Sequence, residues 1–245
     1  IIFHKMSLKE IFFEPTSYLR SIFFKIHLRK NKHNGTTIIT QQNWIKNILK
    51  KKYGLKKIIV SKPNIIFKTK KRIVSKKIIF LYPSLPRFQK NYEVICKACE
   101  NLKNKGLNYQ VLFTFNKNEC RYAKYIHNIA NKNPNIKFIG RKNYNQMKEL
   151  YQKSNYLLFP SKLETWGLPL SEAISFNLPI LASNLNYVRE TVGNYKKIIY
   201  FEPDDYRILS DIIYKIVEKK IKFEKKIYRL KYLENSLSLP WKQII

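Results

Sequence analysis

Short apolar runs alternate with helical spacing over residues 77 to 220. The runs read as buried strands because they are brief, mostly apolar and rich in β-branched and aromatic residues. Between them, apolar residues recur every three or four positions, which predicts crossover helices and a parallel α/β sheet. The six predicted strands are Lys77 to Tyr82, Tyr109 to Phe115, Ile136 to Ile139, Tyr156 to Phe159, Ile180 to Ala182 and Ile198 to Phe201.

The last of these helices has the most regular stripe. Asp204 or Asp205 can cap its start, and every inward position is aliphatic. Its apolar stripe consists of Leu209, Ile212, Ile213, Ile216 and Val217.

Residues 1 to 60 show a similar rhythm that is incomplete. We expect a strand at Ile1 to Phe3, an irregular stretch through Pro15, and then a strand, a helix with Trp44 and Ile45 inward, and a second strand ending at Val60. This is too little for a complete doubly wound sheet. The expected organisation is a partial first lobe with its linker over 1–70, a larger domain over 71–225 and a helical segment over 226–245.

The composition limits the alternatives. A formal net charge of +32 favours phosphate-rich partners of every kind, although the abundant Lys, Ile, Asn and Tyr also fit A/T-rich codon usage.

Cys96 and Cys99 lie on an apolar helical stripe and are expected to be buried. Together with Cys120 and the scattered histidines they form no metal site, and a reducing, cytoplasmic compartment fits these free cysteines best. No apolar run approaches the roughly 20 residues needed to cross a bilayer. Position 1 is not Met, and we expect the chain to be a fragment.

The stretch from residue 159 to 183 carries the candidate chemistry, because it passes from a strand end through a loop into a helix. Ligands of open α/β sheets bind at this edge. Gly167 lets the backbone approach a ligand, and Pro169 suits a first helical turn. The N–H groups of Leu168, Leu170 and Ser171 would then form an anion site suited to a diphosphate.

Two glutamates bracket this anion site. Glu164 lies in the loop and Glu172 in the first turns of the helix, so each could accept hydrogen bonds from a pair of neighbouring hydroxyls. Taken singly, Glu172 would be a residue favouring a helix N-terminus and Glu164 a solvated loop charge.

The same stretch resembles the Glu-x7-Glu signature of family 4 glycosyltransferases, P-S-x-x-E-G-F-G-L-P-x-x-E-A followed by P-V-I-A-S. The matching positions are Pro160, Ser161, Glu164, Gly167, Leu168, Pro169, Glu172, Ala173, Pro179, Ala182 and Ser183. Elements similar to the family's E-V-V-G, F-D-P and F-x-G lie at residues 189–193, 201–203 and 138–140. The likeness covers about residues 77 to 220. It implies a GT-B type fold, with a Rossmann-like, doubly wound parallel sheet and an incomplete N-terminal lobe.

By this resemblance, Glu164 would hold the hydroxyls of the donor sugar and Glu172 the ribose. The backbone from Trp166 to Leu168 would face sugar and phosphate, and Thr165 and Arg141 are also expected to bind the donor. Thr165-Trp166 replaces the common Gly-Phe, which puts the shape of the sugar pocket in doubt.

The family also places an Arg and a Lys five residues apart to neutralise the diphosphate. This chain has Arg87 and Lys90 at a shorter spacing, which makes Arg87 the weaker match. Such cations would stabilise the charge that develops on the departing diphosphate. His4 is similar to the first-lobe His that the family sets near the reacting sugar, although a single His after an apolar run is more often a structural or exposed residue. The Leu239 to Lys242 segment resembles the family's terminal helix.

The resemblance implies a retaining hexosyltransferase that moves a sugar from a UDP- or GDP-sugar to a glycan or lipid-linked saccharide, with no metal and no further cofactor. It would work in the cytoplasm, as a peripheral protein at an anionic inner membrane face. Two alternatives stay open: a non-catalytic nucleotide-sugar binder and a basic nucleic-acid-binding protein. The second is disfavoured because most Tyr and Phe residues fall on core stripes, so no specific nucleic acid is expected.

Overall fold

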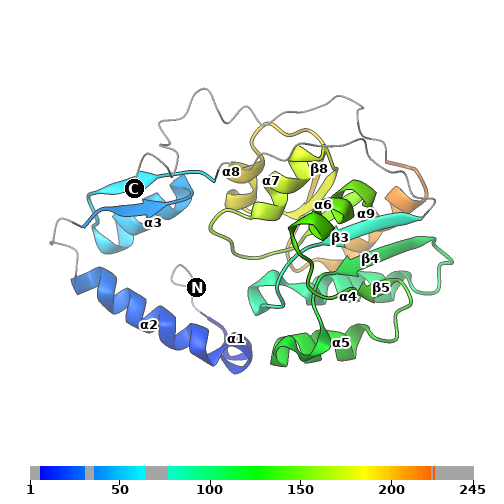
Figure 1. Ribbon diagram of the computed structural model, residues 1–245, viewed down its shortest axis with the longest axis horizontal. Helices are drawn as coiled ribbons and strands as arrows, with labels where there is room; N and C mark the ends of the chain where they lie inside the picture. Colours follow the sequence, from blue (N-terminus) through cyan, green and yellow to red (C-terminus); the bar gives the residue numbers. More distant parts are fainter. Residues whose placement is uncertain (1–5, 31–35, 64–76, 222, 224–245) are drawn as a thin grey trace.

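The structure is a computed structural model that describes residues 6–30, 36–63, 77–221 and 223. Its main body is a parallel sheet of six strands in the order β5-β4-β3-β6-β7-β8 (Figure 1). The strands are β3 (Ile78–Tyr82), β4 (Tyr109–Phe113), β5 (Ile136–Phe138), β6 (Tyr156–Phe159), β7 (Ile180–Ser183) and β8 (Ile198–Phe201). Each predicted strand of this domain is present, and the predicted α/β class with a Rossmann-like sheet is confirmed.

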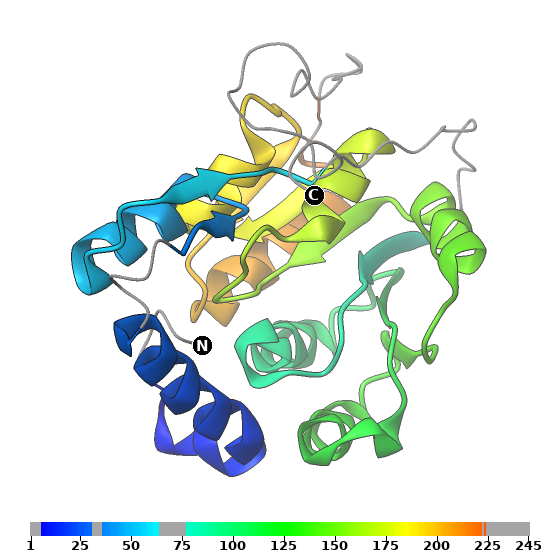
Figure 2. The same cartoon turned by 60° about the vertical axis from the view of Figure 1, so that its left-hand side comes forward.

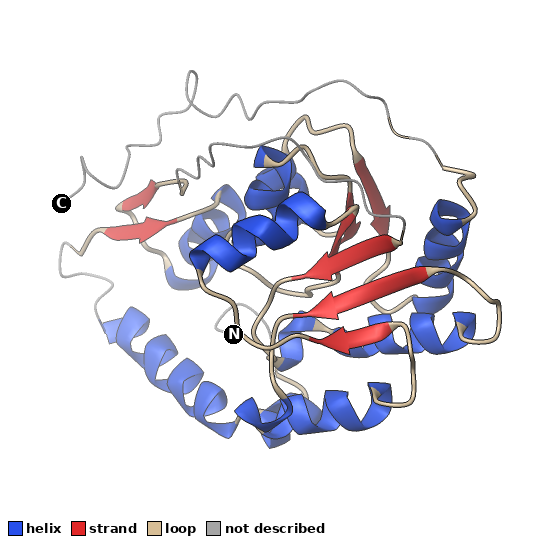
Figure 3. Ribbon diagram, turned by 45° about the vertical axis from the view of Figure 1, so that its right-hand side comes forward, coloured by secondary structure: helices blue, strands red, loops and turns tan. Residues whose placement is uncertain are grey.

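Helices cover both faces of this sheet, as expected for a doubly wound fold (Figure 3). The first set packs together through α4, which contacts both other members, and consists of α4 (Tyr92–Leu102), α5 (Arg121–Ala130) and α9 (Tyr206–Val217). The second set consists of α6 (Tyr144–Lys153), α7 (Leu168–Ser175) and α8 (Asn186–Val192), and α7 packs against α8. Asp205 caps α9 by accepting hydrogen bonds from the N–H groups of Arg207 and Ile208, both at 3.0 Å.

The order of the strands reverses between β3 and β6. From β3 the chain winds outward to β4 and β5, and it then returns to β6 beside β3 and winds the other way. The loops that follow β3 and β6 therefore diverge and leave room between them at the carboxyl ends of the strands. One short 3-10 helix, η2 (Phe88–Lys90), lies in the first of these loops, and a second, η3 (Lys117–Glu119), follows β4.

The core of this domain is rich in aromatic side chains from the central strands and from α4 and α5. Phe80, Tyr82, Phe113 and Phe159 are all completely buried. Cys96 and Cys99 are also buried on α4, where burial raises the pKa of the Cys99 thiol to about 12. The thiol of Cys99 is therefore protonated at neutral pH and packs as a small apolar side chain.

A smaller unit precedes this domain and lies beside it (Figure 2). It contains a second parallel sheet, formed by β1 (Ile38–Thr40) and β2 (Ile58–Val60), with α3 (Asn43–Tyr53) packed on it. Before β1 come two helices, α1 (Leu8–Phe13) and α2 (Pro15–Lys30).

The predicted irregular stretch through Pro15 is therefore wrong, because residues 8 to 30 are almost entirely helical. Ser7 and Glu10 form a reciprocal capping box at the start of α1, and Pro15 occupies the first position of α2. The helices escaped prediction because several large apolar side chains on α2 are exposed, among them Leu19 at 53% and Phe23 at 70%. A buried apolar stripe, the strongest signal for a helix, is thus missing.

Several predictions fall on residues outside the described ranges. They are the strand at Ile1 to Phe3, residues 64–70 at the end of the expected first lobe and linker, and the helical segment over 226–245 with its Leu239 to Lys242 match. The three domain boundaries stay predictions. Within the described ranges, no helix combines the length and the apolar character that a membrane span requires.

Candidate functional site

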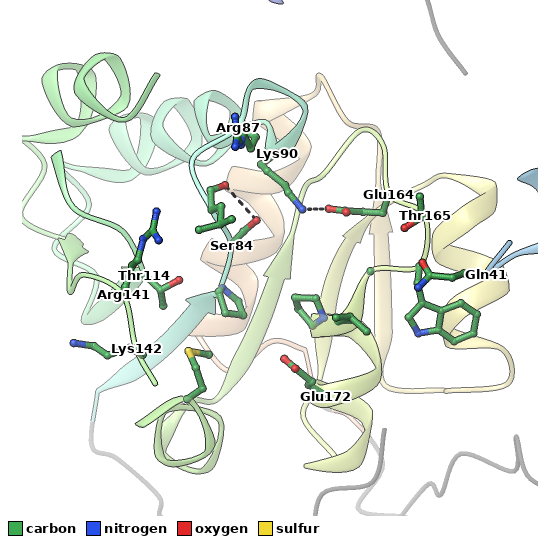
Figure 4. Close-up of a pocket in the computed structure, with 17 residues that line it drawn as sticks. Gln41, Ser84, Arg87, Lys90, Thr114, Arg141, Lys142, Glu164, Thr165 and Glu172 are labelled. Atoms are coloured by element: carbon green, nitrogen blue, oxygen red, sulfur yellow. Dashed lines mark hydrogen bonds and ion pairs between the residues drawn. The ribbon is translucent and has the colours of Figure 1, made fainter. Parts of the chain in front are cut away.

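A cleft of about 540 Å³ lies at the carboxyl ends of the central strands, where the order of the sheet reverses (Figure 4). The loop after β3, the ends of β4 and β5, and the loop between β6 and α7 all contribute side chains to it. Of the nine described site residues predicted from the sequence, each lines this cleft: Arg87, Lys90, Arg141, Glu164, Thr165, Trp166, Gly167, Leu168 and Glu172. The tenth, His4, lies outside the described residues.

The turn into α7 depends on Gly167. Its φ of +83° is in the left-handed region, and a Cβ there would lie 3.2 Å from the ring of Phe159 and 3.1 Å from the side chain of Leu170. A side chain at this position would be both strained and crowded. Glycine therefore allows the backbone to turn tightly over β6 and start the helix beside the cleft.

The predicted set of three free N–H groups at this helix start is reduced to one. The N–H of Leu170 donates to the carbonyl of Gly167 at 2.9 Å, so it is not available to an anion. For the N–H of Leu168, the described part of the chain offers no partner, whereas the N–H of Ser171 already falls within the hydrogen-bonded turns of the helix. The helix start thus offers the unpaired N–H of Leu168, backed by the dipole of α7.

Glu164 and Lys90 point toward one another and form an ion pair (Figure 4). Ser161 also donates a hydrogen bond to Glu164 at 2.8 Å. Lys90 ends η2, and the hydroxyl of Tyr82 donates to its carbonyl at 2.6 Å. The side chain of the next residue, Asn91, donates to the carbonyl of Pro203 at 2.6 Å. This bond anchors the loop to the segment after β8, the strand at one edge of the sheet. The positions of both charged groups are therefore set by neighbouring contacts.

Glu172 faces the cleft from the second turn of α7. The hydroxyl of Tyr151, on α6, donates a hydrogen bond to its Oε2 at 2.6 Å. Burial raises the pKa of the Glu172 carboxyl, and the hydrogen bond from Tyr151 partly lowers it again. One carboxylate oxygen is thus fixed by Tyr151, while the other has no hydrogen bond within the described residues.

The two arginines at the rim are held by acids. Arg87 lies 3.7 Å from Glu14, a buried carboxylate that also accepts the N–H of Phe88 at 2.7 Å. Arg141 donates to Glu119 at 2.9 Å and its side chain is 68% exposed. Figure 4 shows Arg141 across the cleft from the pair formed by Lys90 and Glu164. Lys90 is thus the cation closest to the predicted sugar-binding acid.

Trp166 contributes its backbone to the cleft wall more than its indole. The side chain is 2% exposed, and its Nε1 donates to the hydroxyl of Ser171 at 2.9 Å. Thr191, on α8, donates to the carbonyl of Trp166. The signature that this stretch resembles has Phe at this position; this chain has an indole N–H instead, and Ser171 supplies the acceptor that a buried N–H requires.

Sequence reasoning missed two polar residues at this site. No sequence pattern indicates that the hydroxyl of Tyr151, on α6, meets a carboxylate on α7. Gln41, directly after β1, lines the cleft although it is separated from the rest of the site by more than 40 residues. A neighbouring pair of glutamines after a strand was visible in the sequence, but nothing local connected it to Glu164.

Metal-binding clusters offer no further candidate site. The described residues contain no group of three or more His, Cys, Asp or Glu side chains arranged to hold a metal ion.

Comparison with known proteins places this geometry in context. The model of the family described as glycosyl transferases group 1 matches residues 64–232. The O-antigen chain mannosyltransferase RfbU of Salmonella typhimurium is 23% identical over 202 residues, which cover 79% of this chain and 54% of that protein. The chain thus spans about half the length of this curated relative.

Solved structures share the fold at low identity. A glycosyltransferase from Rickettsia africae ESF-5 has a TM-score of 0.62 and 16% identity, covering 78% of this chain and 56% of that one. A mutant of S. aureus TarM, in complex with fondaparinux, alpha-GlcNAc-glycerol and UDP, has a TM-score of 0.66 and 13% identity, covering 81% and 40%. The family match extends over more than half of the chain and includes every described strand of the six-stranded sheet and every described residue of the cleft except Gln41. The chain belongs to the group 1 glycosyltransferases.

Proposed function

We propose that this chain forms the donor-binding half of a retaining family 4 glycosyltransferase, which moves a hexose-like unit from a UDP- or GDP-sugar to a hydroxyl of a glycan or lipid-linked saccharide. One observation carries the proposal: Glu164 and Glu172 line one cleft, on either side of the start of α7. This is the arrangement required to grip two polyols with a diphosphate between them.

Each part of the donor has a chemically suitable partner. The free oxygen of Glu172 accepts hydrogen bonds from the ribose hydroxyls, while Tyr151 holds the other oxygen in place. The N–H of Leu168, at the start of α7, faces the diphosphate, which carries the charge that a helix start attracts. Glu164 accepts hydrogen bonds from the sugar hydroxyls.

Lys90 acts mainly in the transition state. As the glycosidic bond breaks, negative charge grows on the departing diphosphate, and a nearby ammonium group stabilises this state more than the bound donor. Arg87 and Arg141 add positive potential at the rim, where they are already paired with Glu14 and Glu119. We assign no covalent nucleophile; the diphosphate itself assists deprotonation of the acceptor.

Names of related proteins support the choice of substrates without fixing it. RfbU is a mannosyltransferase of the O-antigen chain, and the TarM mutant was solved with UDP. By analogy, we propose that this chain uses a nucleotide-diphosphate donor and a saccharide acceptor. The net charge of +32 supports work at an anionic cytoplasmic membrane face.

The test is donor binding by the full 245-residue chain. UDP, GDP, UDP-glucose, UDP-GlcNAc and GDP-mannose are compared in a thermal-shift assay, and the anomeric configuration of any product is read by NMR. A ligand at 100 times its Kd stabilises the fold by about 2.7 kcal/mol. Glu172→Ala should abolish this stabilisation, whereas Glu149→Ala, at an exposed position on α6, should leave it unchanged. Equal stabilisation of wild type and Glu172→Ala would rule out the ribose contact.

Two further readouts address the alternatives. Donor binding without any transfer or hydrolysis would point to a non-catalytic nucleotide-sugar binder. Salt-dependent binding to DNA, with no response to any nucleotide, would point to a nucleic-acid-binding protein.

A further inference from the structure

A buried chain of hydrogen bonds connects the smaller N-terminal unit to the loop at Trp166. The Nε1 of Trp44 donates to the side-chain oxygen of Gln42. The side-chain nitrogen of Gln42 donates to the hydroxyl of Thr191 at 2.6 Å and to the carbonyl of Tyr187 at 3.0 Å. Thr191 in turn donates to the carbonyl of Trp166. Gln42 and Thr191 are both completely buried, so these bonds do not compete with water.

A second contact fixes the same segment to α8. Glu190 accepts hydrogen bonds from the N–H of Asn43 at 2.6 Å, from the side chain of Asn43 at 2.9 Å and from the N–H of Trp44 at 3.3 Å. These N–H groups begin α3 and would otherwise lack partners, and a carboxylate also complements the dipole of the helix. The backbone at Gln42 is therefore held against the donor-binding domain on both sides.

This anchoring determines where Gln41 lies. Gln42 points into α8, and the preceding side chain, Gln41, lines the cleft instead. Among the described residues of the cleft, Gln41 is the one that comes before Pro83. Figure 4 shows it on the same side of the cleft as Thr165. Its carboxamide makes no hydrogen bond within the described part of the chain.

We propose that Gln41 is a sugar-contacting residue: its carboxamide exchanges hydrogen bonds with a hydroxyl of the transferred sugar, and Gln42 positions it for this contact. The inference rests on the proposed function, because it takes the position of the sugar from Glu164. An uncharged carboxamide offers both donors and an acceptor, which suits a hydroxyl better than a phosphate. Gln41 thus adds a contact from the N-terminal unit to a sugar site otherwise built by the donor-binding domain.

Calorimetry on the full chain tests the sugar contact. UDP and GDP report on the nucleotide site alone, and UDP-glucose, UDP-GlcNAc and GDP-mannose report on the nucleotide and sugar sites together. Gln41→Ala should weaken binding of the preferred nucleotide sugar about three- to tenfold, the value of one hydrogen bond, and change the affinity for the matching nucleotide less than about twofold. The control is Asn47→Ala, an exposed amide on α3, which should change neither affinity.

A double-mutant cycle tests the positioning role of Gln42. Gln42→Ala should reduce the extra affinity that the sugar provides, and adding Gln41→Ala in that background should cause no further loss, because Gln41 is no longer held in place. Fully additive losses would overturn the positioning role. All variants are compared where their circular dichroism matches that of the wild type.

The outcomes separate this inference from the function on which it rests. If the wild type binds no nucleotide, the proposed function fails. If it binds nucleotide and Gln41→Ala keeps the full extra affinity for the nucleotide sugar, or if the sugar adds no affinity in the wild type, only the role of Gln41 is overturned.

Discussion

Lys90 and Glu164 form an ion pair that joins the loop after β3 to the loop after β6, and each side chain is only 16% exposed. These two loops diverge where the order of the sheet reverses. The pair therefore lies at the boundary between the proposed diphosphate and sugar positions. A bound donor competes for both partners, since phosphate oxygens attract Lys90 and sugar hydroxyls donate to Glu164.

Removal of the Lys90 charge should impair turnover more than binding. Lys90→Ala removes the cation beside the departing diphosphate, and loss of one such electrostatic contact lowers kcat by about 100- to 1000-fold. Initial rates of sugar transfer or donor hydrolysis measure the effect, with calorimetry on UDP and GDP for binding. The matched control is Lys153→Ala, because Lys153 forms an exposed pair with Glu149 and should be neutral. A decrease of less than about twofold in kcat would contradict the role of Lys90.

The site was largely predictable because its main residues lie in one contiguous stretch. Glu164, Gly167 and Glu172 follow a strand and open a helix, so spacing alone brings them to the carboxyl edge of the sheet. Gln41 and Tyr151 could not be found in this way. Gln41 reaches the cleft, and Tyr151 reaches Glu172, through the packing of a separate element. No local pattern in the sequence shows which side chain of another element each of them will meet.

The raised pKa of Glu172 makes a specific prediction about stability and pH. Because burial favours the protonated carboxyl, the folded state binds this proton more tightly than the unfolded state, whose pKa is close to 4.5. The contribution of Glu172 to the free energy of unfolding is therefore lost as pH rises from below 4.5 through the raised pKa. Glu172→Gln should remove this loss and be the more stable protein at neutral pH.

Urea unfolding between about pH 4 and 8 measures this difference between Glu172→Gln and wild type. Glu149→Gln, on the exposed face of α6, serves as the control and should show the same pH dependence as the wild type. A constant difference between Glu172→Gln and wild type over the whole range would mean that the pKa of Glu172 is not raised in the folded protein.

Two glycines with left-handed backbones should respond differently to alanine. Gly106 has a φ of +62° and open space where a Cβ would lie, so Gly106→Ala costs only the backbone strain of about 1–2 kcal/mol. Gly167 adds contacts of 3.1 and 3.2 Å to Leu170 and Phe159, which raises the expected cost of Gly167→Ala to about 2–5 kcal/mol. Chemical denaturation gives both values.

The difference between the two glycines also bears on function. Gly167→Ala should weaken UDP or GDP binding, because the N–H groups at the start of α7 move with the turn, whereas Gly106→Ala should leave binding unchanged. Equal costs in stability and in binding would show that the turn at Gly167 tolerates a side chain.

The fold was predictable where burial produces a pattern and unpredictable where it does not. All six central strands are short and mostly apolar, and α9 has a regular stripe that matches its buried residues, such as Leu209 and Ile213. On α2, by contrast, Ser21 and Leu28 are the buried residues while Phe23 is exposed, so its sequence has no apolar face that matches its burial. Only the capping signals could have indicated helices there.

The buried hydrogen bond between Trp166 and Ser171 provides the last prediction. Trp166→Phe restores the residue that is common in the related sequences, but it leaves the hydroxyl of Ser171 without the indole N–H that it accepts at 2.9 Å. Ser171→Ala leaves the indole N–H without an acceptor instead. Each single variant should lose about 1–3 kcal/mol of unfolding free energy, because a buried polar group then lacks a partner.

The double variant separates the hydrogen bond from the other effects of each substitution. Trp166→Phe with Ser171→Ala removes both polar groups, so its cost should be smaller than the sum of the two single costs by about 0.5–3 kcal/mol. The carbonyl of Trp166 keeps its bond from the hydroxyl of Thr191 in every variant, because residue 166 takes part in that bond only through its backbone. Urea denaturation of the four proteins gives the coupling energy. Additive costs would mean that Ser171 does not compensate for the indole, and that the change from Phe to Trp is accommodated by packing alone.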